Sequence, residues 1–240
     1  MNKENPLGLY EHNRKSYEKI KNAFNRGEKV VGIVHATGTG KTYNALQFVL
    51  EHPDKKAIFI TPYSSIVEHI IETIVKHGLS LEKDFPNLTF MNYQGLVNLS
   101  REELGLIPMD ILILDEFHHI GAPVWGARIH DIIETHPELQ ILGMTAYTIR
   151  SFGTINERDM ANPDGDELFS NKIVSRYDLC DGMLEGVLPK VVYRSAYLKM
   201  LGTLEALEER VKANNCTKKD EELYSKLLHE ARKKIEQALS

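Results

Sequence analysis

An apolar run that leads into a glycine-rich turn is the feature that most constrains this chain. Residues 30–34 are apolar and mostly β-branched, residues 35–42 are His-Ala-Thr-Gly-Thr-Gly-Lys-Thr, and residues 43–50 follow a helical pattern. Glycines in such a turn let backbone N–H groups curl around a polyphosphate, and the N-terminus of the next helix adds partial positive charge. We therefore expect a strand, a phosphate-binding loop and a helix.

The end of this turn, Gly-Lys-Thr, predicts roles for single side chains. Lys41 is expected to reach the β- and γ-phosphates of a nucleoside triphosphate, and the Thr42 hydroxyl is expected to ligate Mg²⁺. The remaining phosphate-binding positions are Ala36, Thr37, Gly38, Thr39 and Gly40. An ordinary glycine-rich turn before a helix is the alternative, but the flanking strand and helix favour the phosphate loop.

The composition is that of an ordinary globular chain. Of its 240 residues, 42% are hydrophobic and 26% are charged, and the net charge is −5. This charge argues against a protein that coats nucleic acid by bulk charge, but it allows a local groove with a few cations. Cys180 and Cys216 are far apart and predict free thiols in a reducing compartment. Because there is neither a signal-peptide pattern nor a membrane-spanning run, we expect a cytoplasmic protein without membrane contact.

Short apolar runs alternate with helical patterns up to residue 144. Strands are predicted at residues 29–34, 57–60, 88–93, 111–114 and 140–144. Helices are predicted at residues 10–24, 43–50, 66–77, 95–104 and 125–135. Wholly apolar strands of this length are typical of a parallel sheet that helices cover on both faces. Polar residues gather just after the strands, at the edge where open α/β sheets bind ligands.

The pattern changes after this point. Residues 150–169 carry many charges and an Asn-Pro-Asp-Gly turn, which predicts an extended loop. Further strands are expected at residues 173–175 and 190–193, around a short helix at 178–185. Two amphipathic stripes after residue 198 predict a helical hairpin. We therefore expect an α/β domain over residues 1–195 and a helical extension over residues 196–240.

A pair of acids follows the buried strand at residues 111–114. Asp115 and Glu116 are adjacent carboxylates at the carboxyl end of that strand, a costly arrangement unless a cation lies beside them. In a phosphate-loop ATPase the Asp holds Mg²⁺ and an adjacent Glu can activate the attacking water. We expect Asp115 to share a Mg²⁺ site with Thr42, and Glu116 to act as the base. A strand that merely ends in acidic loop residues is the alternative.

Several short segments resemble the motifs of superfamily 2 helicases. Residues 115–118, Asp-Glu-Phe-His, match their Asp-Glu-x-His box, and residues 35–42 resemble motif I. Motifs Ia, Ib and III have similar segments at residues 61–64, 92–96 and 143–147, and His12-Asn13 occupies the place of an adenine-reading His-Gln pair. With Gly-Val-Leu-Pro at residues 186–189, the chain most resembles the DEAD/DEAH-box helicases of the restriction-enzyme type.

This resemblance implies a fold, an activity and a set of site residues. The fold would be a RecA-like three-layer sandwich with a mostly parallel sheet, here followed by the helical hairpin. The activity would be ATP hydrolysis with Mg²⁺, coupled to movement on a nucleic acid, DNA being favoured over RNA. Lys41, Asp115, Glu116 and His118 would be catalytic, and Asn13 would join the phosphate loop in binding the nucleotide. The nucleic-acid and coupling residues would be Thr61, Pro62, Ser64, Tyr93, Gln94, Thr145 and Ala146.

The chain also departs from the helicase pattern. His35 stands where Gly or Ala is usual, Asn13 is one methylene shorter than Gln, and Tyr147 replaces the last Thr of motif III. Motors of this kind have a second RecA-like domain that supplies an arginine finger, and this chain ends at Ser240. We therefore expect the second domain to be absent and the isolated domain to hydrolyse ATP slowly.

Three other functions stay open at this point. The chain could be the motor part of a restriction or defence nuclease, whose nuclease residues would lie on another domain. It could be a phosphate-loop ATPase switch that moves protein, although the Asp-Glu-x-His box disfavours this. It could also be a module that binds DNA or a partner protein without catalysis. The sequence does not predict an oligomeric state.

Overall fold

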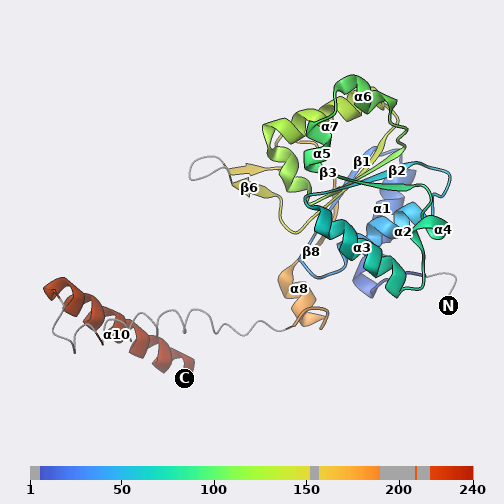
Figure 1. The fold of residues 1–240 in the computed structure, drawn as a ribbon. Coiled ribbons are helices and arrows are strands. Elements are labelled where there is room, and N and C mark those ends of the chain that lie inside the picture. Colours follow the sequence, from blue (N-terminus) through green and yellow to red (C-terminus); the bar gives the residue numbers. More distant parts are fainter. Residues whose placement is uncertain (1–5, 152–156, 190–208, 210–216, 240) are drawn as a thin grey trace. The chain divides into compact units, whose positions relative to one another are not determined.

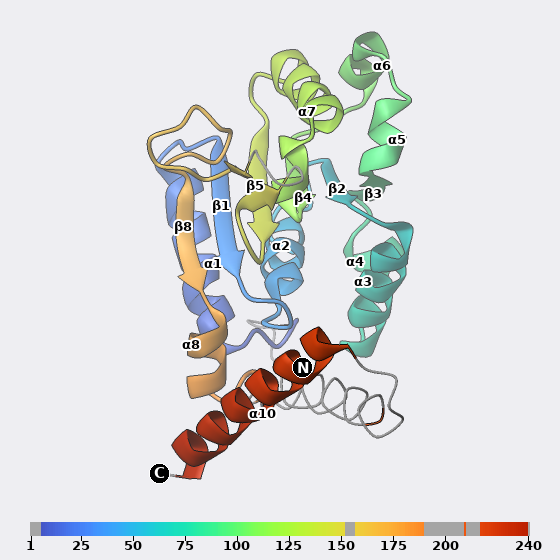
Figure 2. The ribbon, with the colours of Figure 1, turned by 90° about the vertical axis from the view of Figure 1, so that its left-hand side faces the viewer.

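The computed structural model describes residues 6–151, 157–189, 209 and 217–239 of the chain (Figure 1). It divides into two units, Met1–Leu188 and Pro189–Ser240. The first unit is built on a six-stranded sheet with the order β3-β2-β4-β5-β1-β8, which Figure 2 shows with its strands side by side. Every strand pair in this sheet is parallel. The predicted parallel α/β sheet is therefore confirmed.

The six strands form where the apolar runs predicted them. They are β1 (Val30–His35), β2 (Ala57–Thr61), β3 (Leu88–Asn92), β4 (Ile111–Asp115), β5 (Gln140–Thr145) and β8 (Ile173–Tyr177). Every residue of β2 and β4 is buried, as expected for central strands that are covered on both faces.

Helices cover both faces of the sheet. α1 (Glu11–Asn25), α2 (Lys41–Leu50) and α3 (Ser64–Lys76) pack on one face, with the short α4 (Leu81–Asp84) after α3. On the other face lie α5 (Tyr93–Val97), α6 (Arg101–Leu106), the 3₁₀ helix η1 (Phe117–Gly121) and α7 (Pro123–Thr135). Alternate residues of each strand enter the two apolar clusters between these layers, for example Ile113 on one side and Leu112 on the other. This is the three-layer sandwich that the sequence predicted.

The helix predicted at residues 95–104 is in fact two helices, α5 and α6. Ser100 ends the continuity because it forms a capping box with Glu103: its hydroxyl accepts the Glu103 N–H, and the Glu103 carboxylate accepts the Ser100 N–H. This reciprocal pair of bonds starts a new helix at Arg101.

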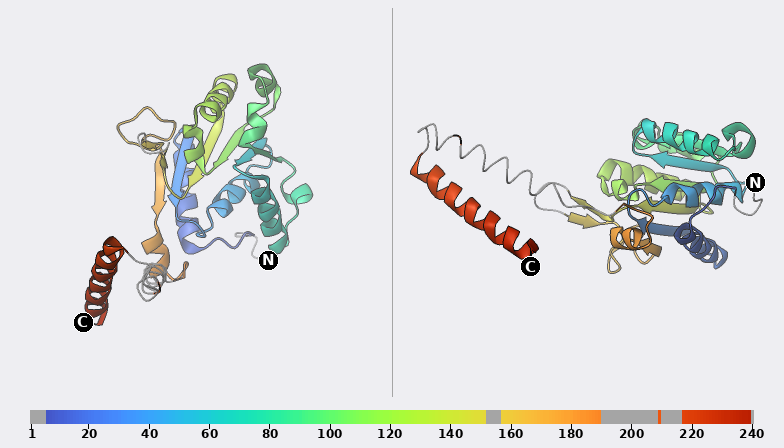
Figure 3. Two further views of the ribbon diagram at one scale, coloured as in Figure 1. Left: turned by 60° about the vertical axis from the view of Figure 1, so that its left-hand side comes forward. Right: turned by 90° about the horizontal axis from the view of Figure 1, so that it is seen from below.

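The extended loop predicted at residues 150–169 is wrong in part. β6 (Ile149–Ser151) and β7 (Glu157–Asp159) form an antiparallel pair that projects from the main sheet (Figure 3). The chain then returns to the sheet, where the fully buried Phe169 ring stacks on Phe117 with 4.1 Å between ring centroids. Phe169 also lies over Gly143, since a Cβ built there would be 2.2 Å from the ring. A segment with loop-like composition thus contributes to the core.

The remaining described elements are helices. α8 (Leu179–Leu184) follows β8, and α10 (Lys218–Leu239) belongs to the second unit. The strand predicted at residues 190–193 and the first helix of the predicted hairpin lie outside the described residues. Among the helices that the structure describes, none has the length and apolar character needed to cross a membrane.

Candidate nucleotide-binding site

The phosphate loop has the backbone shape that its sequence predicts. The loop joins the end of β1 to the start of α2, and Gly38 and Gly40 have φ angles of +83° and +82°. Side-chain-bearing residues rarely adopt such angles, so these glycines permit the tight curl. The Thr39 hydroxyl donates to the Ala36 carbonyl at 2.7 Å and closes the curl.

Lys41 lies inside this curl and not in solvent. Its side chain is buried, and Nζ donates to the His35 carbonyl oxygen at 3.1 Å. Burial lowers the pKa of Lys41, while the nearby Glu116 and Asp115 carboxylates act in the opposite direction. The Lys41 ammonium group is therefore held within the loop and next to the acid pair.

Asp115 is the last residue of β4 and is almost completely buried. Burial and the neighbouring Glu116 charge raise the pKa of Asp115 from 3.8 to about 7, an effect that Lys41 offsets only in part. A carboxylate in this situation favours a bound cation. Its oxygens and the half-buried Thr42 hydroxyl at the start of α2 are hard donors of the kind that Mg²⁺ prefers, so the residues fit this ion.

Glu116 follows Asp115 with a positive φ of 50° and turns its carboxylate towards the end of β5. Burial alone would raise its pKa, but the hydrogen bond with His118 and the Lys41 charge lower the pKa of Glu116 to about 2. The Thr145 hydroxyl contributes from 2.9 Å to Glu116 Oε2, and its single proton is shared with the Tyr147 carbonyl oxygen, which lies at 2.7 Å. Glu116 is therefore ionised at neutral pH.

His118 and Thr145 complete a junction between the ends of β4 and β5. The His118 Nδ1 atom lies 2.8 Å from the Thr145 hydroxyl and 3.4 Å from Glu116 Oε2. The Ala146 N–H also points to Glu116 Oε2, at 3.5 Å. The structure thus brings together the Asp-Glu-x-His box and the Thr-Ala segment, which the sequence predicted only by their order along the chain. We call Glu116, His118 and Thr145 the acid–threonine junction.

Two of the predicted nucleic-acid residues have side chains that lie in the core. Thr61 and Tyr93 are both fully buried and therefore present no side-chain surface to a nucleic acid. Thr61 ends the buried strand β2, and Tyr93 lies under α7, where its ring stacks on Trp125 and its hydroxyl donates to the Asp115 carbonyl at 3.1 Å. Tyr93 thus holds the backbone of the acid pair through this hydrogen bond to Asp115. The other predicted positions on this edge, Pro62, Ser64, Gln94 and Ala146, are at least partly exposed.

The predicted adenine-reading position has an unexpected environment. The Asn13 side chain is fully buried, and its Nδ2 donates to the Thr39 carbonyl oxygen at 2.9 Å. His12, the other residue of the predicted adenine-reading pair, reaches the same carbonyl with Nε2 at 2.7 Å. Sequence alone could not predict this contact, because it joins positions that lie 27 residues apart.

The bulky His35 side chain lies among polar groups of neighbouring elements. Its ring is buried, and Nε2 lies 3.1 Å from the Ser175 hydroxyl and 3.4 Å from the Ser16 hydroxyl. Burial and the nearby His12 and Lys41 lower the pKa of His35 to about 3. The ring is therefore neutral and forms part of a polar contact between α1, β1 and β8.

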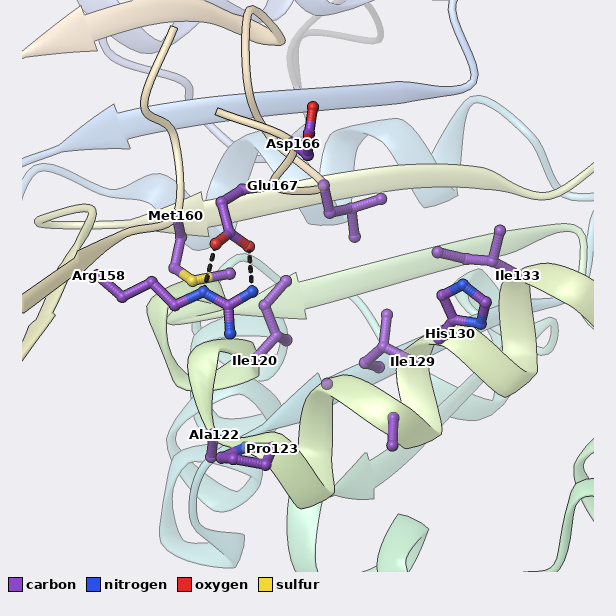
Figure 4. A pocket seen from close by; sticks show the side chains of 13 residues that line it. Ile120, Ala122, Pro123, Ile129, His130, Ile133, Arg158, Met160, Asp166 and Glu167 are labelled. Atoms are coloured by element: carbon purple, nitrogen blue, oxygen red, sulfur yellow. Dashed lines mark hydrogen bonds and ion pairs between the residues drawn. The ribbon is translucent and has the colours of Figure 1, made fainter. Parts of the chain in front are cut away.

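The cavities among the described residues of this unit include two of similar size. One, of about 560 Å³, opens beside the phosphate loop, and its lining includes Ala36, Thr37, Ala146 and Arg176. The other, of about 530 Å³, lies between α7 and residues 158–168, where Arg158 pairs with Glu167 (Figure 4). None of the predicted site residues lines the second cavity. Of these two cavities, the one beside the loop is lined by three of the predicted site residues, Ala36, Thr37 and Ala146.

A family model described as "Type III restriction enzyme, res subunit" matches residues 6–150, which is more than half of the chain. The chain belongs to this family. Within the match lie the phosphate loop, the acid pair and the acid–threonine junction of this res-family chain. No curated protein sequence matches the chain significantly.

Solved structures that resemble this chain include a restriction-modification enzyme, an ATPase core and a helicase. The "ATP-dependent Type ISP restriction-modification enzyme LlaBIII bound to DNA" is 14% identical with a TM-score of 0.54, covering 74% of this chain and 16% of that one. The Sulfolobus solfataricus SWI2/SNF2 ATPase core in complex with dsDNA is 14% identical with a TM-score of 0.49, covering 92% and 57%. The Escherichia coli DEAH/RHA helicase HrpB is 16% identical with a TM-score of 0.49, covering 68% and 22%. The res-family chain thus spans between 16% and 57% of the length of these chains, and the likeness to LlaBIII concerns the fold alone.

Proposed function

We propose that this chain is the ATP-hydrolysing motor domain of a nucleic-acid helicase or translocase, with ATP and Mg²⁺ as cofactors. The observation that carries the proposal is the acid–threonine junction. In it, Thr145 bonds directly to Glu116, the residue proposed as the base, while His118 contacts both. Because Thr145 is the last residue of β5, this hydrogen bond connects the proposed ATP site to the end of that strand. A change at the nucleotide could therefore alter the nucleic-acid surface that follows β5.

The site residues suggest how hydrolysis proceeds. Lys41 would hold the β- and γ-phosphate oxygens, and Thr42 and Asp115 would hold Mg²⁺, which when bound would neutralise developing phosphate charge. The ionised Glu116 orients a water molecule and accepts its proton as the water oxygen bonds to the γ-phosphorus. The bond from that phosphorus to the β–γ bridging oxygen breaks, and ADP leaves. The residues act by position and charge and form no covalent intermediate.

The nucleic acid would lie along the exposed part of the same edge. Pro62, Ser64 and Gln94 follow β2 and β3 there and are at least partly exposed. Such a strand would be held mainly through its phosphates. We favour DNA over RNA because the family is described by a restriction-enzyme subunit, and restriction enzymes act on DNA.

We further propose that residues 1–195 form the RecA-like domain and that residues 196–240 lead to a second RecA-like domain. A second domain would supply an arginine finger, a contribution of about 10³- to 10⁵-fold in rate. The chain alone would therefore bind ATP and hydrolyse it slowly. The family match also favours a specific version of this function, in which the motor serves a restriction enzyme whose nuclease residues lie on another domain.

The proposal is tested by steady-state ATP hydrolysis with no nucleic acid, single-stranded DNA, double-stranded DNA and RNA. We expect slow, Mg²⁺-dependent hydrolysis that a Lys41→Ala variant abolishes, since this variant loses the cation inside the loop. Hydrolysis that survives Lys41→Ala would contradict the site. Brisk, nucleic-acid-stimulated turnover by the chain alone would contradict the need for a second domain.

A further inference from the structure

The Thr39 carbonyl oxygen accepts hydrogen bonds from two side chains of α1. His12 Nε2 lies 2.7 Å from this oxygen and Asn13 Nδ2 lies 2.9 Å from it. All three residues are buried, so water does not compete for these bonds. Two donors on one buried carbonyl fix the direction of that peptide group more firmly than either donor alone.

The direction of this carbonyl decides where the next amide points. In a trans peptide the C=O and the following N–H point in opposite directions, and no peptide in the described residues is cis. Turning the Thr39 carbonyl towards α1 therefore turns the Gly40 N–H away from α1. In a phosphate loop the amides around the second glycine are the donors that receive phosphate oxygens.

We propose that His12 and Asn13 are positioning residues that hold the phosphate loop in its phosphate-binding shape, and that Asn13 does not read the nucleotide base. This inference rests on the proposed function only in taking the loop as the site for the triphosphate. It replaces the expectation that Asn13 selects adenine.

The surroundings of Asn13 carry the second half of the proposal. Its side chain is 0% exposed, its Nδ2 is committed to Thr39, and its Oδ1 is also buried. A Cβ built on Gly40 would lie 2.7 Å from Asn13 Nδ2, so loop and side chain are in tight contact. Neither polar atom of Asn13 can reach a base without withdrawal of the amide from the loop.

His12 is held in place by aromatic rings. Its imidazole stacks on the Tyr177 ring from β8 at 4.2 Å between centroids and on the Tyr10 ring at 5.9 Å, with interplanar angles of 10° and 11°. These contacts fix the plane of the ring and direct Nε2 at the carbonyl. The support of the loop thus comes from α1 and β8 together.

The test compares ligands with and without a base. Calorimetric titration of the full chain with ATP, GTP and inorganic tripolyphosphate, each with Mg²⁺, gives three affinities for each variant. Loss of one hydrogen bond corresponds to a drop of about 2- to 12-fold in affinity. We expect Asn13→Ala and His12→Ala each to weaken all three ligands by the same factor in this range, and His12→Gln, which keeps a donor near Nε2, to recover the loss.

Asn87 offers a matched control. It is also a buried Asn, and its Nδ2 donates to the His52 and Lys55 carbonyls just before β3, at the opposite edge of the parallel sheet. Asn87→Ala should lower the melting temperature without changing any of the three affinities. If Asn13→Ala fails to fold, Asn13→Asp removes the donor at almost constant shape and should weaken the three ligands together.

The outcomes separate the inference from the proposed function. A loss of ATP affinity in Asn13→Ala with tripolyphosphate unchanged would show that Asn13 reads the base. Unchanged affinities in folded His12 and Asn13 variants would show that neither holds the loop. If the wild-type chain binds neither ATP nor tripolyphosphate, the proposed function fails and the inference fails with it.

Discussion

Replacing Asp115 by Asn should make the nucleotide-free protein more stable while removing its function. Asp115 is buried beside Glu116, and the pKa of Asp115 is raised to about 7 from 3.8. Between these two pH values the folded chain keeps a proton that the unfolded chain has released, so folding becomes less favourable as the pH rises. The penalty is absent below about pH 4, grows up to about pH 7 and is constant above it.

The size of the effect follows from the same two values. A difference of about 3 pKa units corresponds to about 4 kcal/mol at about 1.4 kcal/mol per unit. Asn has nearly the shape of Asp and never ionises. The free energy of unfolding of Asp115→Asn should therefore match the wild type near pH 4 and exceed it by up to about 4 kcal/mol at pH 8.

Urea unfolding of both proteins without nucleotide or Mg²⁺, at pH 4 and at pH 8, measures this difference. Asp110→Asn is the control, because Asp110 is exposed and accepts the Lys56 N–H at 2.8 Å. Asp110→Asn should be slightly less stable than the wild type at pH 8, whereas Asp115→Asn should be more stable. A difference for Asp115→Asn that does not grow with pH would refute the reasoning about the buried carboxyl.

Three further predictions concern the same site and its support. Thr145→Val removes the hydroxyl that bonds Glu116, so the slow rate of ATP hydrolysis should fall while ATP affinity stays within about 3-fold; an unchanged rate would contradict the junction. Affinity for Mg²⁺·ATP should rise about 10-fold per pH unit up to about pH 7 as Asp115 loses its proton, and Asp115→Asn should show no such slope. Gly143→Ala should cost about 1–3 kcal/mol in urea unfolding, because its Cβ would lie 2.2 Å from Phe169, whereas Gly105→Ala, with 3.4 Å to its nearest neighbour, should cost nothing.

The features that could be predicted from the sequence are those that depend on short, continuous segments. The phosphate loop, the acid pair after β4 and the apolar strands each depend on residues that are neighbours in the chain. The edge on which they gather follows from the parallel sheet, since the carboxyl ends of all strands lie together. The start of α6 could also have been predicted, because Ser100 and Glu103 have the spacing of a capping box.

The features that sequence could not predict depend on which distant side chains meet. Tyr93 belongs to a helicase-like segment, yet the packing of α5 under α7 places it in the core. Phe169 lies in a charged segment, yet Gly32 and Gly143 on adjacent strands leave room for its ring on the sheet. Asn13 stands in the sequence where an adenine-reading residue is expected, but in the fold its side-chain amide donates to the Thr39 carbonyl of the phosphate loop.

The most direct test of the account is ATP binding and turnover by a Glu116→Gln variant, measured in the same preparation. Gln keeps an oxygen that can accept the Thr145 hydroxyl, but it cannot take a proton from water. We predict ATP affinity within about 3-fold of the wild type and hydrolysis reduced by about 100-fold or more. Hydrolysis at the wild-type rate would contradict the assignment of Glu116 as the base, and with it the proposed ATP-driven motor.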